Sequence, residues 1–209
     1  MLSMSKKALC LIYLGLIGCG GDPATDAPDS LVSDLAQRAG APLFEGLGTF
    51  HMPVTTVDPD AQRYFDQGMV LAFGFNHAES IRSFRAAQTL DPTCAMCFWG
   101  EALATGPNIN VTSNGRAIMS ADERVGARAA IDKALGLLAD LTEKEQDWIR
   151  ALDQRYDGDA ESPREPLDRA WADALGAMAK QYPEDTTVAS IYAEALMNTM
   201  PWDLSLIHI

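Results

Sequence analysis

The sequence predicts an all-α fold built from antiparallel helix pairs. A spacing of 34 residues separates Tyr64 from Phe98 and Gly68 from Ala102, and a period of this length is typical of stacked helical repeats. Apolar residues recur at helical spacing, and no segment of comparable strength alternates with a period of two. Helix start and stop signals also recur along the chain.

Most of the predicted helices have a recognisable start. The first follows a stretch rich in Gly, Pro, Asp and Ala at residues 20–30, and the second begins where Asp58 precedes Pro59, a residue that fits the first helical position. The later starts pair a polar cap with a Glu three residues on, so that each satisfies a backbone amide of the other. These pairs are Asn76 with Glu79, Ser120 with Glu123, Thr142 with Glu145, and Ser162 with Glu165.

Stop signals divide the helices from one another. They are Asp91-Pro92, Gly106-Pro107, Gly158 and Tyr182-Pro183, since Pro cannot continue a helix and Gly readily ends one. Residues 49–57 look extended, although Pro53 makes them a poor strand. We therefore predict helices at about 31–39, 59–74, 77–90, 94–105, 121–139, 143–156, 164–181 and 186–199.

Small residues stand where helices must approach closely. Gly68, Ala87 and Ala102 occupy such positions, and a larger side chain there forces the backbones apart. We expect Gly68→Leu to overpack this contact and to cost about 1–3 kcal/mol.

Residues 58–110 resemble a group of tetratricopeptide proteins of the bacterial envelope whose biochemical role is not settled. The resemblance rests on aromatic residues early in the first helices, on the small residues, and on Pro at the end of the repeat. It implies an incomplete α-solenoid of antiparallel helix pairs over residues 58–203, with residues 182–203 similar to a later repeat and residues 107–123 forming a polar insertion. The positions assigned to repeat packing are Tyr64, Gly68, Ala87, Pro92, Phe98 and Ala102.

The first 18 residues have the pattern of a secretory signal peptide. Lys6 and Lys7 precede an apolar stretch of 11 residues, which is shorter than the roughly 20 residues that span a bilayer. Leu16 to Cys19 resemble the lipobox of bacterial lipoproteins, which implies cleavage before Cys19 and acylation of that residue. By the same resemblance, Gly20 and Gly21 favour the outer membrane, facing the periplasm, with residues 19–57 as a lipid-anchored linker that contains one short helix.

The last six residues, 204–209, resemble the translation of a sequencing-library transposon end. We expect them to be an artefact and the natural protein to be longer, so His208 is not used as a ligand in any interpretation.

The chain is strongly acidic. Its formal net charge is −13, and removal of Lys6 and Lys7 with the leader makes it more negative. Binding to nucleic acid needs clustered Lys and Arg, and the sequence contains no such stripe. Nucleic acid is therefore excluded as an expected partner.

Cys94 and Cys97 are the sharpest chemical candidates. They form a CxxC motif at a helix start, where the helix dipole lowers the thiol pKa. The motif lacks a thioredoxin-like βαβ context and has Phe98 where haem attachment requires His. Packed thiols or a local disulfide, a redox pair, and a metal site with His51 or His77 all remain possible interpretations.

Five apolar residues could form a partner-binding groove, because positions one repeat apart project in the same direction along a stacked array. Met and aromatic surfaces suit adaptable recognition. The alternative is that the same residues form plain core. They are Phe65, Met69, Met96, Trp99 and Leu103.

Two further polar positions carry alternatives. His77 follows the Asn76 cap and is either a neutral, hydrogen-bonded ring at an interhelical turn or a catalytic base. Asn108 and Asn110 are either turn formers or polar ligands of a bound molecule.

The sequence predicts a membrane-anchored scaffold that binds a protein or peptide in the bacterial envelope. It contains no phosphate loop, nucleophile elbow or zinc-protease helix, so we expect no catalytic residue, cofactor or metal. One alternative is the N-terminal part of a longer helical enzyme, or of a redox or metal protein that uses the CxxC motif, with Cys94, Cys97, His77 and Asn108 at one edge. Another is a glycan-capturing outer-membrane lipoprotein.

Overall fold

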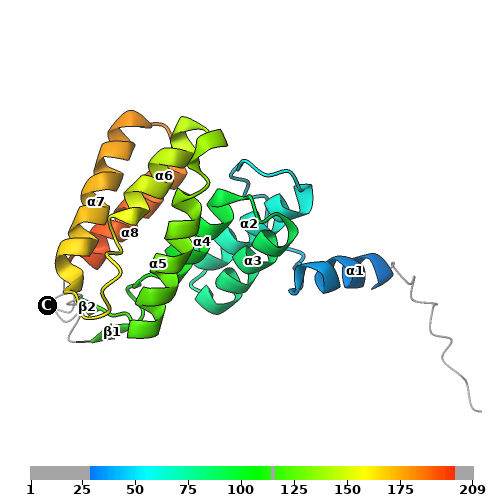
Figure 1. Cartoon of the computed structure of the whole chain (residues 1–209), viewed down its shortest axis with the longest axis horizontal. Helices are drawn as coiled ribbons and strands as arrows, with labels where there is room; N and C mark the ends of the chain where they lie inside the picture. Colours follow the sequence, from blue (N-terminus) through cyan, green and yellow to red (C-terminus); the bar gives the residue numbers. More distant parts are fainter. Residues whose placement is uncertain (1–28, 114–115, 201–209) are drawn as a thin grey trace, which may run out of the picture.

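The computed structural model describes residues 29–113 and 116–200, and this part of the chain is mostly helical (Figure 1). The prediction of an all-α fold is confirmed. The helices are α1 (Asp29–Ala39), α2 (Pro59–Phe73), α3 (His77–Leu90), α4 (Ala95–Thr105), α5 (Ala121–Leu135), the short 3-10 helix η1 (Leu138–Asp140), α6 (Glu143–Asp153), α7 (Arg164–Gln181) and α8 (Thr186–Asn198).

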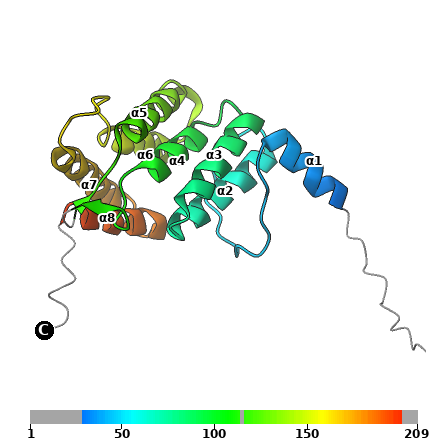
Figure 2. The same cartoon turned by 90° about the horizontal axis from the view of Figure 1, so that it is seen from below.

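Helices that follow one another in the chain contact one another in space. Each of α2 to α7 packs on the next α-helix, and α4 also contacts α2 and α6. Figures 1 and 2 show a row of helices with α2 and α3 toward one end, α7 at the other, and α1 extending beyond α3, while α8 runs back along the row from α7 toward α2. The core is therefore continuous along the row.

Two of the predicted capping boxes are present and two differ. The Ser120 hydroxyl accepts from the Glu123 amide at 3.3 Å, and Thr142 makes the same bond with Glu145. The Asn76 side chain makes no capping bond, and α7 begins with Pro163 in the cap position rather than Ser162. Asp58 caps α2 through the Asp60 amide at 2.8 Å, as expected.

Two helices end earlier than predicted. Gly136 stops α5 at Leu135, and the chain continues into η1 instead of extending the helix to residue 139. Likewise α6 ends at Asp153, not at 156. The polar insertion contains two strands that the sequence did not predict, β1 (Thr112–Ser113) and β2 (Arg116–Ala117), paired antiparallel. Strands of two residues are too short to show any periodicity.

Residues 39–57 pack against the helices and are part of the folded unit. The Tyr64 hydroxyl donates to the Ala41 carbonyl at 2.6 Å, and the Val54 amide donates to Gln62 Oε1 at 2.9 Å. The Thr55 hydroxyl donates to Glu145 Oε2 at 2.8 Å, across 90 residues of sequence. The predicted repeats begin at Asp58, and the folded unit therefore includes residues that precede them in the chain.

The ring of Phe84 fills a gap that two glycines leave between α2 and α4. A Cβ atom on Gly68 would lie 2.7 Å from Phe84 Cε1, and one on Gly100 would lie 2.3 Å from the same atom. Phe84 is fully buried and meets Phe65 edge-on at 5.5 Å between ring centroids. Gly68, Ala87 and Ala102 are buried as predicted, whereas the sequence interpretation missed Gly100.

We expect Gly100→Ala to lower the free energy of unfolding by about 1–3 kcal/mol, because the new methyl group overlaps the Phe84 ring. Gly126→Ala is the matched control, since Gly126 also lies inside a helix and has nothing within 4 Å of its Cβ position. That control should gain up to about 1 kcal/mol from helix propensity. Urea unfolding of both variants checks the expectation, and equal shifts in the two would contradict it.

Asp91 joins the end of α3 to the segment before α2. Its carboxylate accepts hydrogen bonds from the Thr56 hydroxyl at 2.5 Å, the Val57 amide at 2.9 Å, and both the amide and the hydroxyl of Thr93. Burial by itself raises the pKa of Asp91, but the bonds from Thr56, Thr93 and Val57 outweigh it and lower the pKa to about 2.

The Asp91 carboxylate should make stability depend on pH in acid. Its folded pKa of about 2 lies below the unfolded value, which is near 3.9, so its stabilisation is full above about pH 5 and is lost as the pH falls toward 2. We expect Asp91→Asn to be less stable than the wild type at pH 7, with the difference shrinking below pH 4. Denaturant unfolding at several pH values measures this, and a difference that stays constant from pH 7 to pH 2 counts against it.

Among the described residues, no helix combines the length and the apolar character needed to cross a bilayer.

Candidate functional site

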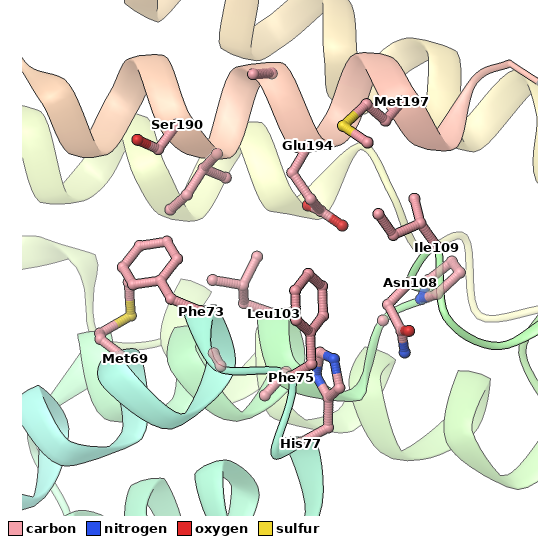
Figure 3. Close-up of a pocket in the computed structure, with 16 residues that line it drawn as sticks. Met69, Phe73, Phe75, His77, Leu103, Asn108, Ile109, Ser190, Glu194 and Met197 are labelled. Carbon is pink, nitrogen blue, oxygen red and sulfur yellow. The ribbon is translucent and has the colours of Figure 1, made fainter. Parts of the chain in front are cut away.

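An apolar pocket lies between the α2–α3 turn, the end of α4 and the exposed side of α8 (Figure 3). Its volume is about 280 Å³, near the lower end of the range for small-ligand sites. Most of its walls are apolar. The lining residues are Met69, Ala72, Phe73, Phe75, His77, Leu103, Ala104, Gly106, Pro107, Asn108, Ile109, Ser190, Ile191, Ala193, Glu194 and Met197.

Three large apolar side chains of this lining are exposed to solvent. Phe73 is 42% exposed, Phe75 is 50% exposed and Met197 is 48% exposed. Because they belong to α2, to the turn after it and to α8, the exposed apolar surface faces the pocket from both sides (Figure 3). Such a clustered apolar surface is characteristic of binding sites.

Phe75 has an unusual backbone conformation. Its φ is +60°, and it is the one residue other than glycine with a positive φ in the described chain. A bulky residue in this left-handed region costs about 1–2 kcal/mol. Gly or Asn would relieve that cost, and strain of this kind concentrates at functional sites.

The ring of His77 lies beneath that of Phe75 (Figure 3). Neither ring nitrogen is accessible to solvent or has a hydrogen-bond partner within the described residues, and the rings of Phe75 and His77 meet edge-on at 6.3 Å. Burial lowers the pKa of His77, and the Ala104 carbonyl and the Glu194 carboxylate only partly oppose this. The lowered pKa agrees with the neutral ring expected from the sequence.

Glu194 projects from α8 into the pocket (Figure 3). One of its oxygens, Oε1, accepts from Asn198 Nδ2 at 2.6 Å. Asn108 lies opposite, and its Oδ1 accepts from the Asn110 amide at 3.0 Å. Asn108 and Asn110 thus form the predicted turn, while Asn108 also lines the pocket.

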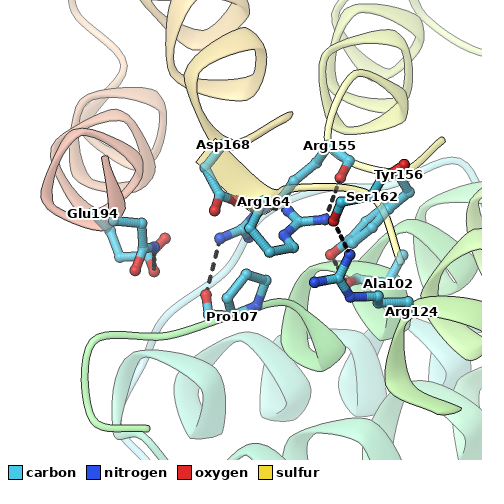
Figure 4. Close-up of polar contacts among 10 residues, drawn as sticks. Ala102, Pro107, Arg124, Arg155, Tyr156, Ser162, Arg164, Asp168 and Glu194 are labelled. Atoms are coloured by element: carbon cyan, nitrogen blue, oxygen red, sulfur yellow. Dashed lines mark hydrogen bonds and ion pairs between the residues drawn. The ribbon is translucent and has the colours of Figure 1, made fainter. Parts of the chain in front are cut away.

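A buried ionic cluster supports the pocket wall formed by residues 106–109 (Figure 4). Arg155, at 1% exposure, donates from Nη2 to the Pro107 carbonyl at 2.9 Å and from Nε to Asp168 at 3.2 Å. Arg164 donates to the same Asp168 oxygen at 2.7 Å. Burial disfavours the charge on Arg155, but Tyr156, Asp168 and Glu194 outweigh it, so the pKa of Arg155 is raised.

This cluster explains why residue 106 is glycine. A Cβ atom there would lie 2.6 Å from both Arg155 Nη1 and the Tyr156 hydroxyl, and that hydroxyl donates to the Ala102 carbonyl at 2.7 Å. The stop signal at Gly106-Pro107 therefore also allows the α6–α7 loop to approach the end of α4.

The predicted partner groove is wrong for most of its residues. Phe65, Met96 and Trp99 have no exposed surface, because neighbouring helices cover the faces on which they lie. These three form core, which was the alternative interpretation. Met69 is also buried but borders the pocket, and Leu103 is half-buried there.

Cys94 and Cys97 form a disulfide at the start of α4. Both residues have no exposed surface. Thiol–disulfide exchange requires direct attack on a sulfur atom, so an external thiol has no access without local opening. This geometry favours a structural disulfide over the redox alternative, and the pair does not line the pocket that contains His77 and Asn108.

The repeat-packing positions fall into two groups. Tyr64, Phe98 and the three small residues are buried between helices, whereas Pro92 is exposed in the turn after α3. Cys19 and residues 204–209 lie outside the described part of the chain. Within that part, no group of three His, Cys, Asp or Glu side chains could hold a metal ion.

Sequence reasoning missed the residues that distinguish this pocket. Ser190, Glu194 and Met197 have the spacing of one helical face. The sequence therefore shows that they lie on the same side of a helix, but it does not show which other helix that side faces. Phe75 gave no signal, because an aromatic residue in a turn does not by itself indicate a positive φ. No family model, curated protein or solved structure matches the chain.

Proposed function

We propose that this chain is a tetratricopeptide-like α-solenoid of the bacterial envelope that binds a protein or peptide partner. The solenoid is supported by the pattern of helix contacts, in which α4 contacts the alternate helices α2 and α6 as well as its chain neighbours α3 and α5. The buried pairs one repeat apart, Tyr64 with Phe98 and Gly68 with Ala102, support the same arrangement.

The observation that carries the proposed function is the apolar pocket between α2, α4 and α8. Repeat proteins bind partners on the concave surface that stacking creates, and α2 and α4 hold the same position in successive repeats of this proposal. Exposed Phe73, Phe75 and Met197 provide adaptable contact area. The strained backbone at Phe75 supports a role in binding, because strain of this kind concentrates at functional sites.

Peptide selection tests this function directly. We would select peptides from a random display library on the full chain and compare their affinities for the wild type, Phe75→Asn and Phe44→Asn. Phe44 is the matched control, since it is 43% exposed and lies outside the pocket. We expect Phe75→Asn to weaken the selected peptides at least tenfold without lowering thermal stability, and Phe44→Asn to leave affinity unchanged. Failure to select any peptide, or equal effects of the two substitutions, refutes the proposal.

The anchor is a separate part of the proposal. The leader and the lipobox-like residues 16–19 support acylation of Cys19 and attachment to the outer membrane. Radiolabelled palmitate should label the wild-type protein in a bacterial host and should not label Cys19→Ala. Equal labelling of both would place the acyl chain elsewhere.

The enzyme alternative is favoured by one observation, the presence of His77 and Asn108 in the same pocket. A neutral His is the form required of a general base. Phe75 covers the ring and the cysteines lie elsewhere, so binding remains the function that the geometry supports best.

A further inference from the structure

The polar groups of the pocket include one charged hydrogen-bond acceptor, the Glu194 carboxylate, and one neutral donor, the Asn108 side-chain amide. The Ser190 hydroxyl donates its hydrogen bond to the Thr186 carbonyl at 2.7 Å. Glu194 Oε2 has no hydrogen-bond partner within residues 29–113 and 116–200, and an ionised carboxylate only accepts. A ligand that satisfies this oxygen must therefore bring a donor.

The electrostatics favour a cationic donor over a neutral one. The chain carries a formal net charge of −13, which attracts cations to its surface. Arg155 carries a positive charge behind the pocket wall formed by residues 106–109. Its side chain is 1% exposed and is hydrogen-bonded to Pro107 and Asp168, so it does not contact a ligand in the pocket. The carboxylate is thus the charged group that a ligand can contact.

Aromatic and apolar surface lies beside this carboxylate. Figure 3 shows Phe75 and Glu194 directed toward each other across the pocket, with Phe73 and Leu103 along the apolar side. The face of a phenyl ring attracts an ammonium or guanidinium group within about 6 Å. The pocket therefore complements a ligand in which an apolar group lies next to a cation, because the apolar group can contact Phe73 and Leu103 while the cation contacts Glu194.

We propose that the pocket receives a protein segment in which an apolar side chain is followed by a Lys or Arg. The apolar side chain packs on Phe73 and Leu103, and the basic group donates to Glu194 beside the Phe75 ring. This inference rests on the proposed function and specifies the class of partner. The pocket volume of about 280 Å³ suits anchor side chains rather than a whole helix.

Three small probes with one ring and different head groups separate the contributions. They are 2-phenylethylamine, 2-phenylethanol and 3-phenylpropanoate, titrated into the full chain with ¹³C-labelled methionine methyl groups. Met69 and Met197 line the pocket, and Met178 in α7 is an internal control. We expect the amine to shift the two pocket methyl groups with an affinity about tenfold above that of the alcohol, as for a charge-assisted bond, and the carboxylate to bind weakest.

Two variants assign the preference to one residue. Glu194→Gln should make the amine and the alcohol bind equally, whereas Glu45→Gln, which removes the same charge at an exposed position outside the pocket, should keep the preference. An amine preference that survives in Glu194→Gln overturns the inference. Methyl shifts with no head-group preference overturn it too but leave the binding function standing, while no shift with any probe removes both.

A fourth probe distinguishes a protein segment from a free amine. N-acetyl-Phe-Lys-amide should bind more tightly than 2-phenylethylamine, and N-acetyl-Phe-norleucine-amide should bind at least tenfold more weakly than the Lys peptide. If the Lys peptide binds no better than the amine, the pocket takes a small amine and the assignment to a protein partner is wrong.

Discussion

Trp99→Ala should destabilise the protein by about 3–5 kcal/mol, the range for removing a fully buried large aromatic side chain. Trp99 has no exposed surface, and its ring lies 5.2 Å from that of Trp148. Its Nε1 donates to the Trp148 carbonyl at 3.0 Å, so the substitution leaves a cavity between α4 and α6 and removes the hydrogen bond that joins these two helices.

Denaturant unfolding monitored by circular dichroism measures this effect. Trp99→Phe should cost less, since it keeps most of the ring contact and loses only the hydrogen bond and part of the area. Phe44→Ala, at a residue that is 43% exposed, should cost under about 1 kcal/mol. A Trp99→Ala variant that stays as stable as the wild type but loses partner binding would restore the groove interpretation.

Arg155→Met should cost about 3–5 kcal/mol, the range for breaking a buried ion pair by removing one partner. The substitution leaves the Pro107 carbonyl without its donor and leaves Asp168 with Arg164 alone. Because the same guanidinium holds residues 106–109, we also expect weaker binding of 2-phenylethylamine at temperatures where the variant is still folded.

Arg85→Met is the matched control for Arg155→Met. Arg85 pairs with Glu101 at 2.7 Å, a shorter distance than that between Arg155 and Asp168, but its side chain is 64% exposed. Exposed pairs contribute roughly 0–1 kcal/mol, so this variant should be nearly as stable as the wild type. Similar losses in the two variants would show that burial of Arg155 is not what makes its pair important.

The order and type of the helices could be predicted because their signals are local. Pro59 after Asp58, and the pairs Ser120 with Glu123 and Thr142 with Glu145, depend on contacts within four residues, and the structure places helix starts at each of them. The predicted end of α5 was wrong, because the apolar periodicity continues to residue 139 but Gly136 ends the helix at Leu135.

The candidate site could be predicted only in part. His77 and Asn108 were selected from the sequence as polar residues next to helix ends, and both line the pocket. The aromatic and Met residues selected for a groove are mostly core, because the sequence shows that a helix face is apolar but does not show whether another helix covers it. For the same reason, the sequence did not indicate that Met197 and Glu194 line a pocket.

The sequence by itself determined that this chain is helical, where most helices begin and end, and which small residues allow close packing. Those properties follow from hydrogen bonding and side-chain periodicity over a few residues. Only the tertiary structure decided that Phe84 fits against both Gly68 and Gly100, that Arg155 holds the Pro107 carbonyl, and that α8 meets the α2–α3 turn around an open pocket. These contacts join residues that are at least 16 positions apart in the sequence, and their geometry depends on how whole helices pack.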